Sequence, residues 1–350
     1  MKDINCLILS SPELKKNWLN GFISQILPGA SYKKFYGQHI FCLESGKRVI
    51  LTEDETLEET NNWVNDLDSN CFIITSNHYF FQKLLNLGFE TIFFPYRMWF
   101  YMLIPLRKLG ILSIDKSIKN DKTIFNFLNR RWSPGRYYLL DFIFRIHSDL
   151  LHYGTVTANK FTYYQDHPLL YKDRDFLAFY KNHDTFGENI TIKNGLSVSS
   201  NLENLFYIAE NIPGVISIQV ETFTPDDFYK SCYTEKSMTA LATQQIPIII
   251  GPQPGLIARL ENQGFDVFRD VVNQEYDKEK DYNRRLELAI NNNVEILSGK
   301  KSIPNLDDRL KSNQQYLFSS WTNKELTRLQ INLLNFVQNV KSPIRIDTKN

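Results

Sequence analysis

A chain of 350 residues is longer than one hydrophobic core usually serves, so we expect two α/β domains. Hydrophobic residues make up 43% of the chain and charged residues 23%, which excludes an intrinsically disordered protein. The 40 basic and 39 acidic residues leave a net charge of +1, which argues against strong nonspecific binding to DNA or to an anionic membrane.

In the first third of the chain, apolar runs alternate with helical patterns, which predicts a parallel, doubly wound sheet. The expected strands are residues 4–9, 48–51, 71–74 and 91–94, and the expected helices are 12–27, 57–67 and 80–87. Gly88 stands where the last of these helices should end. We expect residues 1–115 to form an N-terminal, Rossmann-like domain.

A second alternating set begins near residue 122 and predicts a second Rossmann-like domain over residues 116–300. The expected strands are 123–128, 215–220, 246–250 and 266–268, and the expected helices are 137–151, 202–210, 235–244 and 256–263. Residues 301–350 are expected to form helices and a tail that cross back to the first domain. The predicted fold class is α/β, with two doubly wound domains and a helical C-terminal region.

Cysteine usage and hydropathy bear on the compartment of the protein. Cys6, Cys42, Cys71 and Cys232 form no CxxC pair, so we interpret them as free thiols of a reducing compartment. The N-terminus lacks the apolar core of a signal peptide, and the most apolar stretch, 92–106, is interrupted by two prolines and an arginine. We therefore expect a cytoplasmic protein without an integral membrane segment.

In the second domain, a polar loop leads from an expected buried strand to the next expected helix. The first strand ends in Glu221, and the run Tyr233, Thr234, Glu235 and Lys236 stands where the next helix begins. A helix N-terminus offers unpaired N–H groups and a partial positive charge, and Lys236 adds a full charge, so this end suits a diphosphate. Thr234 can cap the helix, and Glu235 can accept hydrogen bonds from ribose hydroxyls.

Gly251 follows the next strand, and ligands of open α/β sheets bind at the carboxyl ends of strands. We expect the loops after both strands to converge on one crevice. The run GPQPG, 251–255, is interpreted as a stiff turn rather than a P-loop, because its prolines remove the N–H groups that a phosphate cradle needs.

The run YTEKSMTALATQQIPIIIG, from Tyr233 to Gly251, resembles the donor-binding motif of the α-1,3-fucosyltransferases and of related phage and bacterial glycosyltransferase-like proteins. The continuation GPQPGLIARLENQGFDVF is similar to the same relatives. The resemblance implies a metal-independent, inverting glycosyltransferase of the two-domain GT-B type, with acceptor and donor bound in the first and second domains. It also implies that Lys236 pairs with a donor phosphate and that Glu235 contacts the ribose.

Two departures from the family pattern leave the donor open between a GDP-sugar and a UDP-sugar. Tyr233 directly precedes Thr234, one residue closer than in many fucosyltransferases, and Glu221 stands in a stretch that differs from theirs. The resemblance places the protein in a bacterial cell or in a phage-infected host.

A second candidate for phosphate binding is the turn NRRWSPGR, residues 129–136. Arg130, Arg131 and Arg136 follow an expected strand and open a helix, so they can clamp a diphosphate with planar, multi-donor geometry. In the resembled family a turn of this kind supplies a phosphate-binding arginine, and Arg136 is the best match. The alternative is an ordinary solvated basic turn.

Inverting transfer to a hydroxyl needs a side chain that takes the acceptor proton. Glu53 and Asp54 directly follow one expected strand of the first domain, and His78 follows another, so these three are the first candidates for the base. Glu44 and Glu55 stand in similar positions, and the sequence favours none of the five.

We expect no metal ion and no cofactor besides the nucleotide-sugar donor, which is a substrate. The DxD triplet at Asp173–Asp175 lies in an irregular region rather than after an apolar strand, and the six histidines show no metal-ligand spacing. Lys236, the arginines and the helix ends would instead stabilise the charge of the leaving diphosphate.

The leading hypothesis is transfer of a sugar to a glycan hydroxyl. One alternative is a phage-type DNA glycosyltransferase that acts on hydroxymethylated bases, for which residues 33–36 and 96–100 would supply basic and aromatic contacts. The other alternative is a catalytically inactive protein that binds a nucleotide sugar. The oligomeric state is left open.

Overall fold

The computed structural model describes residues 23, 26–27, 29–35, 38–52, 67, 69–75, 78–94, 103, 113–115, 123–129, 134–158, 209, 214–221 and 235–338. The chain divides into two compact units, and each is described by itself. Unit 1 draws on residues 1–110, 229–233 and 320–350, and unit 2 draws on 111–228 and 234–319.

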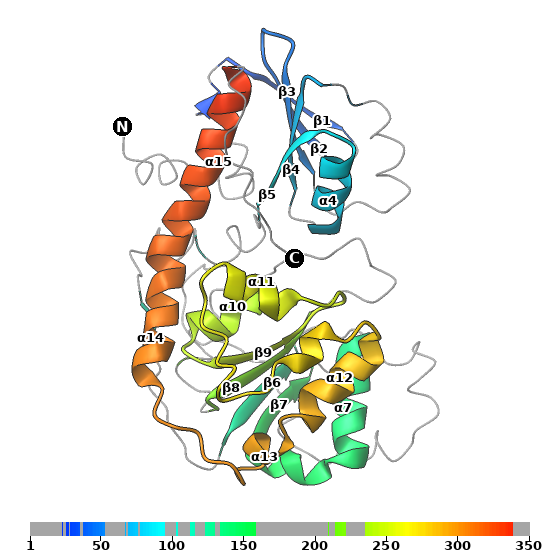
Figure 1. Ribbon diagram of the computed structural model, residues 1–350, viewed down its shortest axis with the longest axis vertical. Helices are drawn as coiled ribbons and strands as arrows, with labels where there is room; N and C mark the ends of the chain where they lie inside the picture. Colours follow the sequence, from blue (N-terminus) through cyan, green and yellow to red (C-terminus); the bar gives the residue numbers. More distant parts are fainter. Residues whose placement is uncertain are drawn as a thin grey trace, which may run out of the picture. The chain divides into compact units, whose positions relative to one another are not determined.

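Unit 1 contains a mixed sheet whose strands follow one another in chain order (Figure 1). These strands are β1 (Ser31–Phe35), β2 (Gln38–Cys42), β3 (Arg48–Thr52), β4 (Cys71–Thr75) and β5 (Glu90–Phe93). β1, β2 and β3 pair antiparallel, whereas β3, β4 and β5 run parallel. The predictions for β3, β4 and β5 are confirmed, but the hairpin of β1 and β2 was missed, so a wholly parallel sheet was the wrong prediction.

In unit 1, β4 lies between β3 and β5 and is buried along its whole length. A continuous apolar strand of this kind is typical of a parallel sheet that is covered on both faces. The helix α4 (His78–Asn86) packs Phe80 and Leu84 against Ile73 of β4. The chain turns after this helix at Gly88, which has a φ of +82° and confirms the predicted stop.

The long C-terminal helix α15 (Thr322–Val337) belongs to unit 1. The guanidinium of Arg328 donates to the Phe93 carbonyl at 2.6 Å and pairs with the Glu325 carboxylate. Nearer the end of the helix, the ring of Phe336 lies 5.4 Å from the ring of Phe72. These contacts hold α15 against β4 and β5.

Unit 2 is built on a fully parallel sheet with the order β7, β6, β8, β9. The strands are β6 (Phe125–Asn129), β7 (Gly154–Ala158), β8 (Ile216–Val220) and β9 (Ile246–Ile250). The helices are α7 (Pro134–Ile146), α10 (Glu235–Ala242), α11 (Leu256–Asn262), α12 (Tyr282–Asn291), α13 (Val294–Leu297) and α14 (Asp307–Tyr316). Shorter helical turns are η2 (Ser148–Tyr153) and η7 (Glu275–Lys278), and the π-helical η8 (Leu317–Trp321) spans the boundary between the two units.

The strand order of unit 2 reverses between β6 and β8. From β6 the chain passes through α7 to β7 on one side, and β8 then pairs on the other side of β6 and leads through α10 to β9. In Figure 1, α7 and α12 lie together on one face of this sheet and α10 lies on the other. At such a reversal the connecting loops diverge to opposite faces and leave a crevice at the carboxyl ends of the strands.

Two predicted elements of unit 2 differ from the structure. The helix expected from residue 137 begins at Pro134, a favoured first helical residue, and ends at Ile146, where η2 takes over. The strand expected at 266–268 does not form. The Asp266 carboxylate accepts the N–H of Phe268 at 2.8 Å, and Phe268 has a φ of +55°, so this segment is a side-chain-supported turn.

The strand expected at 4–9 and the helix expected at 57–67 lie largely outside the described residues, as do the helices expected at 12–27 and 202–210. Within the described part of the chain, no helix is both long and apolar enough to cross a membrane. The assignment of the two units to the acceptor and donor domains of a GT-B protein stays a prediction.

Candidate functional site

The candidate site lies at the carboxyl edge of the unit 2 sheet, on the border between β6 and β8. Arg136, in the first turn of α7, is only 2% exposed, and its Nε donates to the carbonyl of Val220 at 2.7 Å. Val220 is the last residue of β8, so this hydrogen bond fastens the start of α7 to the end of the neighbouring strand. Arg136 therefore fixes the start of α7 at this edge of the sheet.

Glu221 fixes the same edge from the β8 side. It directly follows β8 and is 1% exposed, and its main-chain N–H donates to the Ile250 carbonyl at 3.0 Å, at the end of β9. Its carboxylate accepts a hydrogen bond from the Ser237 hydroxyl, in the first turn of α10. A carboxylate is favoured beside a helix N-terminus. Glu221 thus joins β8, β9 and α10 at the expected crevice.

The remaining predicted donor residues divide into those that the structure describes and those that it does not. Glu235 and Lys236 are the first two residues of α10, as predicted, but their side chains lie outside the described residues. Gly251 is buried after β9, and a Cβ there would approach the Leu256 side chain to 3.2 Å. Four other predicted residues lie outside the described part of the chain: Arg130, Arg131, Tyr233 and Thr234.

The candidate bases belong to unit 1. His78 is the first residue of α4, but its side chain lies outside the described residues, as do Glu53 and Asp54. All three stay predictions.

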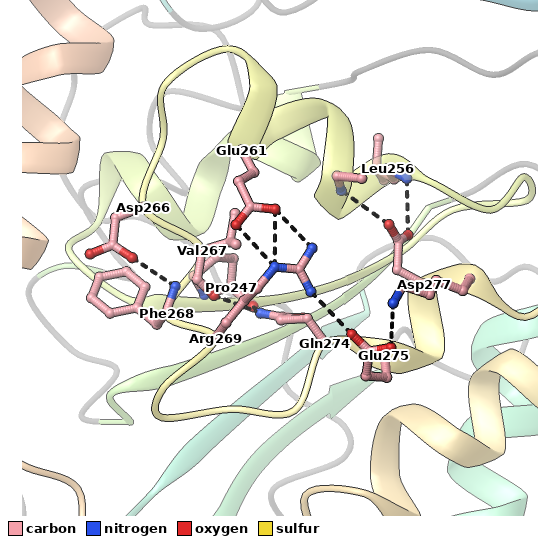
Figure 2. Close-up of polar contacts among 12 residues, drawn as sticks. Pro247, Leu256, Glu261, Asp266, Val267, Phe268, Arg269, Gln274, Glu275 and Asp277 are labelled. Atoms are coloured by element: carbon pink, nitrogen blue, oxygen red, sulfur yellow. Dashed lines mark hydrogen bonds and ion pairs between the residues drawn. The ribbon is translucent and has the colours of Figure 1, made fainter. Parts of the chain in front are cut away.

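The N-terminus of α11 is occupied by a carboxylate from its own unit (Figure 2). The Asp277 side chain, 3% exposed, accepts the N–H of Leu256 at 2.9 Å and that of Ala258 at 3.1 Å, and its main-chain carbonyl accepts the N–H of Gly255 at 2.8 Å. The first amides of α11 are therefore already hydrogen-bonded. This supports the interpretation of GPQPG as a stiff turn rather than a phosphate cradle.

Two further side chains hold the segment that carries Asp277. Gln274 donates to the carbonyls of Pro247 at 2.8 Å and Val267 at 2.9 Å, which anchors this segment beside β9 (Figure 2). Arg269 forms a bidentate pair with Glu261 on α11, with contacts of 2.9 to 3.0 Å. These contacts fix the segment after α11 against β9 and against the end of α11.

The Asp277→Asn variant is expected to gain stability relative to the wild type as the pH rises. Burial raises the pKa of the Asp277 carboxyl above its ordinary 3.8, although the N–H groups of Ala258, Ile257 and Leu256 act in the opposite direction. A carboxyl with a raised folded-state pKa stabilises the fold fully below the unfolded pKa, and that stabilisation is lost as the pH rises through the folded pKa. The asparagine side chain does not titrate.

Urea unfolding of both proteins between about pH 4 and about pH 7 measures this difference. The expected result is that the free energy of unfolding of the variant, relative to that of the wild type, increases steadily with rising pH. If the free energy of unfolding of the variant instead decreases relative to that of the wild type, the N–H groups, and not burial, dominate the pKa of Asp277.

Sequence reasoning missed two buried residues of α12, Tyr282 and Arg285. Arg285 is 0% exposed; its guanidinium donates to the Pro252 carbonyl at 2.8 Å and to the Glu279 carbonyl, and it lies 5.5 Å from the centre of the Tyr282 ring. The Tyr282 ring packs on Gly135, where a Cβ would lie 2.0 Å from the Tyr282 hydroxyl. The sequence did contain a signal of their burial. Tyr282 and Arg285 recur at helical spacing with Leu286, Ala289 and Ile290, so they lie on the buried face of α12.

Burial shifts the pKa of both residues. It raises the pKa of the Tyr282 hydroxyl to about 12, and Glu221 acts in the same direction, while Arg285 and Arg136 oppose the shift. Burial also lowers the pKa of the Arg285 guanidinium. Tyr282 is therefore a neutral hydrogen-bond donor near neutral pH, and two of the groups that act on it, Arg136 and Glu221, lie at the border between β6 and β8.

Among the described residues, no group of three or more histidine, cysteine, aspartate or glutamate side chains is arranged to hold a metal ion. The DxD triplet at 173–175 lies outside those residues. Comparison of the chain with protein-family models, with curated proteins and with solved structures gave no match.

Proposed function

We propose that the crevice between β6 and β8 binds the diphosphate of a nucleotide sugar, and that the protein is an inverting, metal-independent glycosyltransferase of the GT-B type. The observation that carries the proposal is the reversal of strand order at this border, with Arg136 on one side and Glu221 on the other. Open parallel sheets bind their ligands at such reversals.

The two helices that open at this crevice suit an anion. α7 and α10 both begin at the carboxyl edge of the sheet, where their first N–H groups and helix dipoles favour negative charge. Lys236, Arg130 and Arg131 would add the positive charge that a diphosphate requires. Arg136, a further predicted phosphate ligand, is 2% exposed, and its hydrogen bond to Val220 holds the start of α7 at this edge of the sheet.

The remaining predicted residues would recognise the other parts of the donor. Glu235 would accept hydrogen bonds from the ribose, while Tyr233, Thr234, Glu221 and Gly251 would line the pocket. The base would be Glu53, Asp54 or His78.

The proposed reaction is a single inverting displacement. The base removes the proton of the acceptor hydroxyl as the oxygen attacks the anomeric carbon of the sugar. The bond from that carbon to the diphosphate breaks, and the nucleoside diphosphate leaves with the electron pair. Cationic side chains and helix N-termini stabilise the charge that develops on the leaving group. A glycan hydroxyl is the proposed acceptor.

Thermal unfolding with UDP-, GDP-, ADP- and CMP-sugars tests the proposed binding. At least one diphosphate sugar is expected to raise the melting temperature, because a ligand at 100 times its Kd stabilises a fold by about 2.7 kcal/mol. Lys236→Ala is expected to abolish this shift, because the diphosphate loses its charged partner at the start of α10. Lys311→Ala, at an exposed position of α14, is the matched control and should keep the full shift.

Catalysis is tested separately from binding. The wild type is expected to release nucleoside diphosphate slowly from the donor that binds, with water as the acceptor, and Lys236→Ala should not. Binding without any release would favour the inactive-protein alternative. A wild type that no nucleotide sugar stabilises would contradict the proposed function.

A further inference from the structure

The hydroxyl of Tyr282 is a buried polar group whose partner is not found among the described residues. Tyr282 is more than nine-tenths buried, and its hydroxyl accepts and donates no hydrogen bond in the described part of the chain. A neighbouring buried tyrosine behaves differently, because the Tyr276 hydroxyl donates to the Ile249 carbonyl at 3.2 Å. Buried polar groups are nearly always paired, so an unpaired one calls for a ligand or a function.

The hydroxyl points at the first turn of α7. A Cβ built on Gly135 would lie 2.0 Å from the Tyr282 oxygen and 2.7 Å from its Cζ, so the ring has room only because residue 135 is a glycine. Gly135 is the second residue of this 13-residue helix, and the first N–H groups of a helix have no partner within it. The hydroxyl therefore lies at the positive end of α7, beside Arg136.

Two buried arginines make this neighbourhood favourable for an anion. Arg285 hydrogen-bonds only to carbonyls among the described residues, and the carboxylates of Asp277, Glu279 and Asp281 act on its charge without a hydrogen bond to it. Arg285 and Arg136 both favour negative charge at the Tyr282 hydroxyl, and Glu221 opposes them. The stacking of Arg285 on the Tyr282 ring, at 5.5 Å, also holds the ring in this orientation.

We propose that the Tyr282 hydroxyl donates a hydrogen bond to an oxygen of the diphosphate in the β6–β8 crevice. This inference rests on the proposed function and adds to it a recognition residue outside the motifs at 129–136 and 221–251. The hydroxyl stays protonated near neutral pH, so it can serve as a donor to an anionic oxygen. Binding would supply the partner that the described residues do not.

The test compares Tyr282→Phe with a matched control, Tyr276→Phe, by calorimetric titration with UDP, GDP and inorganic pyrophosphate. Tyr282→Phe should keep or raise the melting temperature of the ligand-free protein, because it removes an unpaired hydroxyl and keeps the ring. It should raise the Kd of each probe that binds the wild type about tenfold to a hundredfold, as loss of a hydrogen bond to a charged group does. Tyr276→Phe should lower the melting temperature and leave the Kd unchanged.

The outcomes separate this inference from the proposed function. If the wild type binds UDP or GDP and Tyr282→Phe binds them within about twofold of it, the inference is wrong and the proposed function stands. A clearly lower melting temperature of ligand-free Tyr282→Phe would show a structural partner for the hydroxyl and would also overturn the inference. If the wild type binds pyrophosphate but neither UDP nor GDP, and Tyr282→Phe weakens that binding, the contact between Tyr282 and a diphosphate is supported and the proposed function is wrong. A wild type that binds no probe overturns both.

Discussion

Arg285→Ala is expected to lower the free energy of unfolding by about 3–5 kcal/mol, from two lost hydrogen bonds and a cavity together. Arg285 is fully buried, and its guanidinium joins the Pro252 carbonyl after β9 to the Glu279 carbonyl before α12. Truncation would leave both carbonyls without this donor and would open a cavity under the Tyr282 ring. Both losses fall on the edge of the sheet where we propose that the donor binds.

Arg284 provides a matched control at the adjacent position. Its side chain is 55% exposed and pairs with Glu287 at 3.2 Å on the surface, so Arg284→Ala should cost about 0.5 kcal/mol or less. Arg285→Lys should be nearly as damaging as the alanine variant, because an ammonium group cannot reproduce the planar, two-sided contact. Urea unfolding of the three variants measures the difference. Equal costs at positions 284 and 285 would show that the buried guanidinium contributes nothing to stability.

The strands that could be predicted are those with continuous apolar sequence. β4 and β9 read CFIIT and IPIII, and both are buried at every position, so hydrophobicity alone was enough to identify them. The end of α4 at Gly88 was predictable from the glycine itself, and Gly264 stands at the corresponding place after α11. Both residues have positive φ, which glycine adopts without strain.

Elements were less predictable where they depend on which strands pair, or on whether a side chain or a strand takes a main-chain N–H group. β1 reads SYKKF and β2 reads QHIFC, and neither strand shows a strong alternation of apolar and polar residues that would reveal a hairpin. At residues 266–268 the apolar pattern suggested a strand. The Asp266 side chain instead takes the Phe268 N–H, and no sequence pattern shows which partner that N–H will find.

The candidate site was predictable in position but not in environment. Arg136 and Glu221 were identified because they follow strands, and both lie at the carboxyl edge of the sheet. Their nearly complete burial was not foreseen, since arginine and glutamate are usually exposed. Asp277 and Arg285 were missed because their partners, Leu256 and Pro252, lie 21 and 33 residues away along the chain. Contacts of that range depend on the tertiary fold and not on local patterns.

Gly135→Ala is expected to lower the free energy of unfolding by about 1–3 kcal/mol, the usual cost of an overpacked site. Helix propensity alone predicts the opposite sign, because alanine is more favourable than glycine within a helix by about 1 kcal/mol. Steric overlap should prevail, since the new Cβ would lie 2.0 Å from the Tyr282 hydroxyl and the stacked Arg285 restrains that ring. Gly251→Ala is the matched control, with its nearest neighbour at 3.2 Å and an expected cost of under about 1 kcal/mol.

A double-mutant cycle identifies the atoms responsible for this cost. In a Tyr282→Ala background the Gly135→Ala cost should vanish, which gives a coupling energy of at least about 1 kcal/mol. In a Tyr282→Phe background the relief should be partial, because the hydroxyl contact is gone but Cζ still lies 2.7 Å from the new Cβ. Additive costs in both backgrounds would mean that the ring does not rest on Gly135, and the proposed diphosphate contact of Tyr282 would lose its geometric basis.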